Sequence, residues 1–307
     1  MLRLSVIVPF YNVELYIEDC ICSLYNQYIP WEEYEVICVD DCSWDNSRKK
    51  VEELQNKYPT LKLISHEKNK RQGGARNTGL KEAKVQYIWY VDSDDYIYPN
   101  IFRKLLEVAE LSMVDILQFA HTRGENTKNK ELNLSQIITG ENYLFSNVTN
   151  DWFDKISGPW KQIFNRDFLL NSGLKFIEGA MYEDTDYLLQ AFLAAKKVQH
   201  ISLVAYHYRI NADSITITPV TPVKLAWHVN LIARCGKLIN KTTTSIARET
   251  IATMVSHTLS QLRGDVAKFS IKEKLVYLKF LNDIGVCKKF ISWRTWLSIR
   301  YGLTWFI

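Results

Sequence analysis

Acidic residues follow an apolar run in the middle of the N-terminal half of the chain. Asp92, Asp94 and Asp95 come directly after the run at 87–91, so they occupy the turn behind a candidate strand. Carboxylates at positions i and i+2 of such a turn can converge on one hard cation, and Mg²⁺ or Mn²⁺ accepts their oxygens while leaving positions open for phosphate. The alternative for this motif alone is a solvated acidic turn that caps the next helix.

Two further motifs also lie beside candidate strands, and a third begins a helical pattern. They are SVIVPFYN at 5–12, VDDCSWDNS at 39–47 and GGARNTGL at 73–80. The last places Arg76 beside glycines at the beginning of a helical pattern, which suits an anion. Each motif is a weak signal alone, whereas the four in this order are a strong one.

The elements that must position these motifs alternate between strand and helix patterns. Apolar runs predict strands at 4–8, 34–39, 61–65, 86–91 and 114–120, and helical spacing predicts helices at 13–28, 45–58, 72–83 and 98–111. Such alternation predicts an α/β fold with a mostly parallel central sheet flanked by helices and right-handed crossovers. The acids should therefore gather at the carboxyl edge of the sheet, where such folds bind ligands.

The later part of the chain has a different pattern. Further strands are expected at 198–202 and 204–209, and the pattern after Thr221 is entirely helical. Pro219 and Pro222 interrupt regular structure between the two parts. We therefore expect a domain at 1–216 and a C-terminal helical region at 217–307.

Composition excludes several classes of protein. The 307 residues carry a net charge of only +4, which argues against a nucleic-acid partner. No uninterrupted apolar run reaches about 18 residues, so no membrane span is expected. The six cysteines contain no CxxC pair, and with no signal-peptide pattern at the N-terminus we expect reduced thiols in a cytoplasmic protein.

At these motifs the chain resembles the family-2 glycosyltransferases. The matching text is SVIVPFYN, VDDCSWDNS, ARNTGL at 75–80 and VDSDD at 91–95, joined by YEDTD at 182–186 and YHYRINADSIT at 206–216. The resemblance covers residues 1–216 and implies the GT-A fold. One departure is Cys42, which stands in a turn where the family usually has glycine or asparagine.

The resemblance implies roles at the donor site. Asp41 would accept the N3–H of uracil, and the chemistry agrees because an ionised carboxylate only accepts hydrogen bonds. Pro9 and Tyr11 would frame the uracil ring, and Asn12 belongs to the same nucleotide-sugar-binding set. The alternatives are that Asp41 caps the following helix, for which Asp45 is the better candidate, and that Tyr11 is plain core.

The same resemblance assigns the phosphate side. Asp94 would be the principal ligand of Mn²⁺ or Mg²⁺, and Asp92 would bind the ribose hydroxyls or belong to the metal shell. Arg76 would hold the pyrophosphate or position the aspartates, the alternative being a surface salt bridge. His207 is a candidate for a further metal ligand, and a buried structural histidine is the competing interpretation.

On the acceptor side, the resemblance points to Asp184 as the general base. Glu183 is its neighbour, and residues next to each other on a helix point about 100° apart, so only one of the two should face the site. The alternative for Asp184 is an acid that favours the helix dipole. Further candidates, each with a structural alternative, are Trp160 and Lys161 on the acceptor side and Arg209 and Ser214 near phosphate.

Together these features predict a metal-dependent, inverting transfer of a hexose or N-acetylhexosamine from a UDP-sugar to a glycan or lipid-linked acceptor. A role in capsule, lipopolysaccharide or other surface polysaccharide synthesis is what the resemblance implies. The alternative is a catalytically inactive UDP-sugar-binding module. A nucleotidyltransferase or NAD-dependent dehydrogenase is disfavoured because Pro9-Phe10-Tyr11-Asn12 replaces the glycine-rich loop after the first strand.

The C-terminal end adds a charge signal. From Arg263 onward nine cations face three anions, a net charge of +6, and residues 288–307 mix Trp and Phe with Arg and Lys. This composition suits a helix in a membrane interface, which would make the protein peripheral at the inner face of the cell membrane. Packing of the same aromatic face on protein, including a second subunit, is the alternative, and the oligomeric state stays open.

Overall fold

The computed structural model describes residues 2–124, 141–143, 158–211, 220–239, 268–274 and 276. The chain forms two compact units. The first consists of Met1–Phe145, Gly158–Gly179 and Ala194–Ala212, and the second of Ser146–Ser157, Ala180–Leu193 and Asp213–Ile307. The predicted boundary at 216/217 falls between described segments and stays a prediction.

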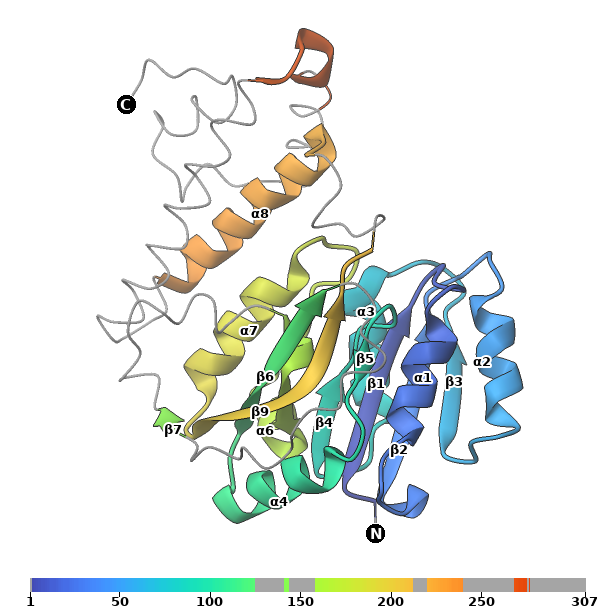
Figure 1. The fold of residues 1–307 in the computed structure, drawn as a ribbon. Coiled ribbons are helices and arrows are strands. Elements are labelled where there is room, and N and C mark those ends of the chain that lie inside the picture. Colours follow the sequence, from blue (N-terminus) through green and yellow to red (C-terminus); the bar gives the residue numbers. More distant parts are fainter. Residues whose placement is uncertain are drawn as a thin grey trace. The chain divides into compact units, whose positions relative to one another are not determined.

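The first unit contains the sheet and the helices that alternate with it (Figure 1). In chain order its elements are β1 (Leu4–Phe10), α1 (Ile17–Tyr25), β2 (Tyr34–Asp40), α2 (Ser47–Gln55), β3 (Leu61–Ser65), α3 (Arg71–Glu82), β4 (Tyr87–Tyr90), β5 (Tyr96–Ile97), α4 (Phe102–Ser112), β6 (Ile116–Gly124), β7 (Glu141–Tyr143), β8 (Gln162–Asn165), α6 (Arg166–Asn171) and β9 (Val198–Arg209).

The sheet is mostly parallel, as predicted. Its strand order is β3-β2-β1-β4-β8-β6-β9-β5, and β7 pairs with β9. Strands β3, β2, β1 and β4 run parallel to one another, β8 is antiparallel to both β4 and β6, and β9 runs parallel to β6. This order places the loops after β1, β2, β3 and β4 along one edge.

The register makes the ends of the first three strands level. Phe10 pairs with Asp40, and Asp40 pairs with Ser65. The backbone continues this pattern for one more residue, since the N–H of Asp41 donates to the Phe10 carbonyl and the N–H of His66 donates to the Asp40 carbonyl, each at 2.9 Å. Three loops therefore emerge side by side.

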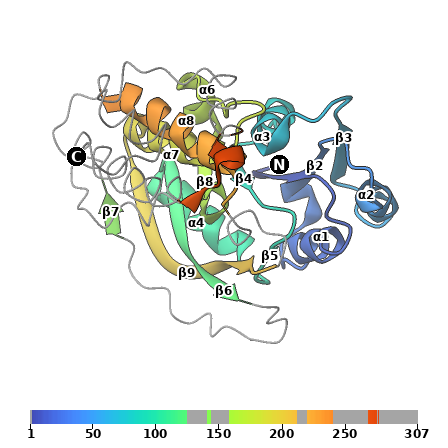
Figure 2. The ribbon, with the colours of Figure 1, turned by 90° about the horizontal axis from the view of Figure 1, so that it is seen from above.

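Helices cover both faces of this sheet. Figures 1 and 2 show α1 and α4 on one face and α3 on the other. Leu4, Val6 and Val8 of β1 belong to the core shared with α1 and α4, whereas Ile7, between them, meets Gly79 of α3. Burial on both faces explains why the strand reads as a continuous apolar run rather than an alternating one.

Several element bounds differ from the prediction for local reasons. The helix expected at 98–111 begins at Phe102, because Tyr96 and Ile97 pair with β9 and Asn100 adopts a left-handed φ of 61°. The helix expected at 13–28 is confined to Ile17–Tyr25. The two strands expected at 198–202 and 204–209 form one strand, β9, whose register with β6 shifts near Ala120.

The second unit contains α7 (Glu183–Ala194) and α8 (Pro222–Ile239), and the latter confirms a helix after Thr221. Within this unit a guanidinium nitrogen of Arg234 lies 3.1 Å from Oδ1 of Asp186, and the Tyr182 ring stacks on His228 at 4.0 Å. Among the described residues no helix is both long and apolar enough to cross a membrane. Residues 288–307 lie outside the described part.

Candidate active site

Asp41, directly behind β2, is a buried carboxylate with one oxygen engaged and one unengaged. Its side chain is 2% exposed. Oδ1 lies 2.8 Å from His66 Nδ1 and accepts a second hydrogen bond, also at 2.8 Å, from the backbone N–H of Lys70. Oδ2 is buried and has no hydrogen-bond partner. A buried acceptor in this state costs free energy unless a ligand donates to it, which favours the predicted binding role of Asp41 over that of a helix cap.

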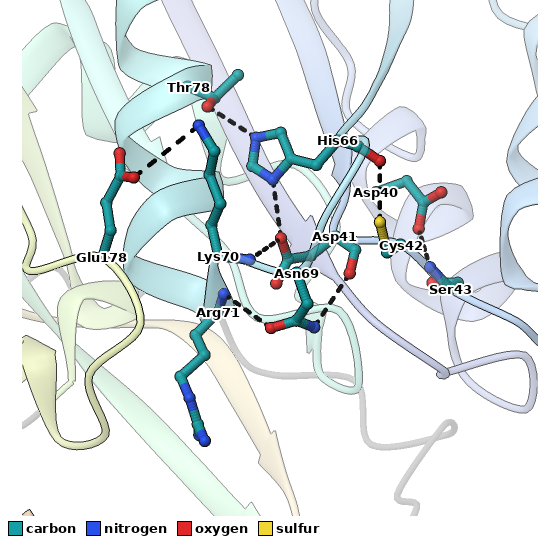
Figure 3. A network of polar contacts seen from close by, with 10 residues as sticks. All are labelled: Asp40, Asp41, Cys42, Ser43, His66, Asn69, Lys70, Arg71, Thr78 and Glu178. Atoms are coloured by element: carbon teal, nitrogen blue, oxygen red, sulfur yellow. Dashed lines mark hydrogen bonds and ion pairs between the residues drawn. The ribbon is translucent and has the colours of Figure 1, made fainter. Parts of the chain in front are cut away.

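The groups that hold Asp41 come from the next two elements (Figure 3). His66, directly behind β3, connects the carboxylate to α3, because its Nε2 lies 2.9 Å from the Thr78 hydroxyl. The Asn69 amide donates to the Asp41 carbonyl at 3.1 Å. Asp41 is therefore fixed from the sheet edge and from α3 at once.

The loops after β1 and β2 are joined to each other. The Asn12 N–H donates to the Ser43 hydroxyl at 3.2 Å, and the Trp44 N–H donates to the Asn12 side-chain oxygen at 3.0 Å. Asn12 and Cys42 hold left-handed φ values of 52° and 68°, which turn both loops at this edge. Asp45 accepts from the N–H of Ser47, the first residue of α2, and so satisfies a helix donor as predicted.

Pro9 and Tyr11 lie at the end of β1 beside these loops. Pro9 is a buried strand residue opposite Val39 of β2. Tyr11 is 44% exposed, so it is not core. Both residues therefore adjoin the Asp41 loop, to which β1 is joined by the Asp41 N–H and Phe10 carbonyl bond.

Arg76 is turned inward from α3. It is 2% exposed, and one guanidinium nitrogen donates to Oδ1 of Asp92 at 2.8 Å. The guanidinium also lies over the Phe176 ring at 5.2 Å. A surface salt bridge is excluded by this burial, and the geometry fits the predicted role of positioning an aspartate.

The acidic turn behind β4 is held by residues near the end of β9 and by Asn211, two residues beyond that end. Asp95 is 1% exposed, and it accepts from the Tyr206 hydroxyl at 2.5 Å and from the Arg209 N–H at 2.7 Å. Asp94 is half-buried and accepts from the Asn211 amide at 2.8 Å. Burial, followed by the neighbouring carboxylates, raises the pKa of Asp94 and raises that of Asp95 to about 9.

These carboxylates fit a hard divalent cation. Burial and the charge of Asp92 both disfavour the ionised form of Asp94, and a cation would relieve both effects. Asp94 and Asp92 supply hard oxygen donors of the kind that Mg²⁺ or Mn²⁺ prefers. No group of three or more potential ligands is assembled among the described residues, so phosphate and water oxygens would complete the shell.

His207 has a different set of neighbours. Its Nδ1 lies 2.7 Å from the Thr122 hydroxyl, and its ring stacks on Tyr96 at 4.5 Å. Burial lowers its pKa. Tyr206 and His207 are consecutive strand residues and project to opposite faces of β9, and it is Tyr206 that reaches the acidic turn. The described contacts therefore do not join His207 to Asp94, and its role as a metal ligand stays a prediction.

The other candidates for the acceptor side and the phosphate side have different surroundings. Trp160 is 7% exposed and stacks on Tyr206 at 4.6 Å, so it packs as a core residue. Lys161 is also buried. Arg209 places its guanidinium over the Tyr16 ring at 5.1 Å, and Ser214 lies outside the described residues.

Asp184 lies in the first turn of α7, in the second unit. Its Oδ1 accepts from the N–H of Thr185 at 2.9 Å, and its side chain is half-buried, whereas Glu183 is buried. Asp186, which sequence reasoning did not single out, is buried against Arg234, and burial raises its pKa to about 6. The difference between Glu183 and Asp184 agrees with the expectation that the two point apart.

Sequence reasoning missed the residues that hold the site together. His66 could have been found, because it follows β3 as Asp41 follows β2 and is a polar residue at the same edge. Tyr206 and Asn211 gave no such signal, since their approach to the acidic turn depends on how β9 pairs across the sheet.

Comparison with known proteins decides which family has this arrangement. The sequence profile of Glycosyl transferase family 2 matches residues 5–167, more than half of the chain. The chain belongs to glycosyltransferase family 2. It is 31% identical over 228 residues to the uncharacterized glycosyltransferase EpsJ of Bacillus subtilis, a match that covers 71% of this chain and 64% of EpsJ.

Two other similar proteins have more specific descriptions. A poly(ribitol-phosphate) beta-glucosyltransferase of Bacillus spizizenii is 32% identical over 221 residues, or 69% of this chain and 33% of that protein. Staphylococcus aureus TarS 1–349, solved in complex with UDP-GlcNAc, superposes with a TM-score of 0.73 at 25% identity, covering 92% of this chain and 80% of TarS. The glycosyltransferase therefore has the GT-A fold. It spans less than two thirds of the length of EpsJ and of the glucosyltransferase.

Proposed function

We propose that this glycosyltransferase transfers a hexose or N-acetylhexosamine from a UDP-sugar to a glycan or lipid-linked acceptor, with inversion, in the synthesis of a bacterial surface polysaccharide. The observation that carries the donor assignment is the buried Asp41 carboxylate, whose Oδ2 has no hydrogen-bond partner. The UDP-GlcNAc complex of TarS and the similarity to the poly(ribitol-phosphate) beta-glucosyltransferase support the same proposal.

Asp41 suits uracil because of what the base presents. Uracil offers a ring N3–H, which Oδ2 can accept, whereas cytosine offers a lone pair at the same position. Two acceptors facing each other inside a buried site are unfavourable, since neither recovers the hydrogen bond it made in water. Tyr11, with its exposed ring, would stack on the base, and Pro9 and Asn12 would shape the rest of its pocket.

Asp94, Asp92 and Arg76 suit the diphosphate. Asp94 would hold a divalent ion, Mn²⁺ or Mg²⁺, with Asp92 in its shell or on the ribose. When bound, that ion neutralises the negative charge that collects on UDP as it leaves. Arg76 holds Asp92 from behind through the 2.8 Å contact, so the carboxylate keeps its orientation.

Asp184 is the proposed general base. Its place in the first turn of α7 favours the ionised form, because the helix dipole stabilises an anion there. The carboxylate would take the proton from an acceptor hydroxyl while that oxygen bonds to the anomeric carbon. The bond to UDP breaks on the opposite face, so the configuration of the sugar inverts in one displacement.

Base selectivity gives the sharpest test of the donor. Titration calorimetry with UDP and CDP should show a preference for UDP of roughly 5- to 100-fold in the wild type. Asp41→Asn keeps an oxygen for the Lys70 N–H but places an amide donor at the Oδ2 position. It should therefore weaken the binding of UDP and strengthen the binding of CDP. Equal binding of UDP and CDP by the wild type would refute the donor assignment.

Turnover separates an enzyme from an inactive module. UDP release from UDP-glucose, UDP-galactose and their N-acetyl forms should require acceptor and Mn²⁺ or Mg²⁺, and should fall at least about 100-fold in Asp94→Asn and Asp184→Asn. Stabilisation by UDP and metal without turnover on any acceptor of a wall-polymer and lipid-linked panel would favour the alternative, a UDP-sugar-binding module.

A lipid-linked acceptor would place the enzyme at the inner face of the cell membrane. The aromatic and basic composition of residues 288–307 supports this part of the proposal. The full chain should float with anionic liposomes and a chain ending at residue 287 should not. Equal and negligible binding by both would remove the membrane contact and leave the rest of the proposal standing.

A further inference from the structure

His66 stands between the candidate base-binding carboxylate and α3, and both of its ring nitrogens are engaged. Nδ1 lies 2.8 Å from Asp41 Oδ1 and Nε2 lies 2.9 Å from the Thr78 hydroxyl. Its side chain is only 7% exposed. Figure 3 shows the ring filling the space between the two partners.

The direction of these hydrogen bonds follows from the partners. An ionised Asp41 can only accept, so Nδ1 of His66 carries the hydrogen. In a neutral ring Nε2 is then an acceptor, and the Thr78 hydroxyl donates to it. The sequence of donors runs from Thr78 through His66 to Asp41, and a hydroxyl can take this direction because its hydrogen rotates freely.

The consequence for Asp41 is that only one of its oxygens is left for a ligand. Oδ1 receives the His66 ring and the Lys70 N–H, and both donors come from the connection between β3 and α3. Rotation of the carboxylate would break both bonds inside a buried site. Oδ2 therefore keeps one direction, and it is the oxygen that has no partner.

We propose that His66 is a positioning residue that sets the nucleobase selectivity of the donor site. It holds Asp41 so that a bare acceptor oxygen, rather than a rotating or hydrated carboxylate, meets the Watson–Crick edge of the base. This inference rests on the proposed function, since it requires that Asp41 faces the base. His66 itself touches Asp41 and not the ligand, so its effect is on discrimination.

The support of His66 by α3 gives the proposal a structural basis. Thr78 is followed by Gly79, which packs directly against Ile7 of β1, so the hydroxyl sits on a part of α3 that is fixed to the sheet. Two residues earlier, Arg76 reaches Asp92 at 2.8 Å. One helix thus contacts both His66 and the acidic turn.

Two substitutions of His66 by amide residues separate the roles of its two ring nitrogens. In asparagine the amide nitrogen is bonded to Cγ, as Nδ1 is in histidine, so His66→Asn keeps a donor for Asp41 and loses Thr78. In glutamine the amide is one bond further, close to the place of Nε2, so His66→Gln keeps Thr78 and loses Asp41. Thr78→Val is the matched control, because it removes the hydroxyl and leaves Nδ1 in place.

The measurement is the ratio of UDP to CDP affinity, by titration calorimetry on the full chain, with thermal unfolding as the check on folding. The wild type should prefer UDP by roughly 5- to 100-fold. His66→Asn and Thr78→Val should keep most of that ratio. His66→Gln and His66→Ala should reduce it to about threefold or less, mainly through weaker UDP binding.

If His66 had a merely structural role, its substitution would weaken the binding of UDP and CDP together and leave the ratio of the two affinities unchanged. Retention of the wild-type ratio in both His66→Gln and His66→Ala would therefore overturn the proposal while leaving the donor assignment intact. Absence of any UDP preference in the wild type would instead show that the donor assignment itself fails, and the proposal with it.

A second measurement covers the case in which the variants do not fold. Long-range ¹⁵N–¹H spectra of the wild type should show the His66 ring protonated at Nδ1, both without ligand and with UDP bound. A ring protonated at Nε2 alone could not donate to Asp41 and would overturn the proposal without any variant.

Discussion

Gly79→Ala tests how closely α3 must approach the sheet. A Cβ at this position would lie 2.3 Å from Cγ2 of Ile7 and 3.1 Å from its Cγ1, whereas ordinary contact begins at 3.4 Å. Ile7 sits in β1 with β2 paired on one side and β4 on the other, so it has little freedom to retreat. Helix α3 must therefore move away by about 1 Å, the difference between 2.3 and 3.4 Å.

Two opposing effects decide the sign of the change in stability. Alanine is a better helix former than glycine by about 1 kcal/mol at an exposed site. Overpacking a buried contact costs about 1–3 kcal/mol and here involves a central strand, so it should win. With the overpacking cost near the upper end of that range, the net loss is about 1–2 kcal/mol, so we expect the melting temperature to fall by roughly 2 to 8 °C, at 2–4 °C per kcal/mol for a unit of this size.

The displacement should also reach the donor site. Arg76 and Thr78 precede Gly79 on α3, and their contacts to Asp92 and His66 are 2.8 and 2.9 Å long. A shift of about 1 Å takes both beyond hydrogen-bond distance, so UDP affinity should fall about tenfold or more. Thermal unfolding and titration calorimetry of the same preparation measure the two effects together.

The double variant provides the control. Ile7→Ala alone should cost about 2–5 kcal/mol, because it leaves a cavity under α3. In combination with Gly79→Ala the new methyl group fills part of that cavity, so the double variant should be more stable than the sum of the two by about 0.5–3 kcal/mol. Strictly additive losses, or a Gly79→Ala variant as stable as the wild type, would refute the close-packing argument.

Two other substitutions probe buried charges. Arg76→Met leaves Asp92 without its ion-pair partner, so it should cost about 3 kcal/mol of stability and reduce kcat/KM for the UDP-sugar. An unchanged kcat/KM would show that Arg76 does not position the aspartates. Asp186 binds its proton more tightly in the folded state, since burial raises its pKa to about 6 from its ordinary value of 3.8. Its contribution therefore lowers stability as the pH rises from about 4 to 6. Asp186→Asn should flatten that decline in urea midpoints measured at pH 4.5 and 7.0, and an unchanged slope would contradict the raised pKa.

Local sequence determined the first half of the sheet well. The runs at 4–8, 34–39 and 61–65 are short and apolar, so strand type and position followed from them, although β1 continues through Pro9 to Phe10. The beginning of α4 did not follow, because Tyr96 and Ile97 are taken up by pairing with β9, a contact more than a hundred residues away in the chain. Helical spacing alone cannot exclude such a pairing.

The residues of the candidate site also differ in how far local sequence could predict them. Asp41, Asp92 and Asp94 were predictable because each follows a parallel strand, and parallel strands end at one edge. The partners that hold them were predictable only where they also follow a strand, as His66 does. Tyr206 belongs to β9, and Asn211 lies beyond the end of that strand. How β9 pairs across the sheet could not be predicted from its own sequence. Asp184 lies at the helix beginning that its motif indicated, in the second unit.

The level ends of β1, β2 and β3 confine nucleoside recognition to a short stretch of polypeptide. The groups that hydrogen-bond to Asp41, and the Thr78 hydroxyl that contacts His66, lie between residues 10 and 78. On the proposed function, the residues that select the donor nucleotide would be encoded separately from the helices that follow the sheet. Exchanging that stretch between relatives should transplant the preferred nucleotide while the sugar-receiving polymer stays that of the recipient.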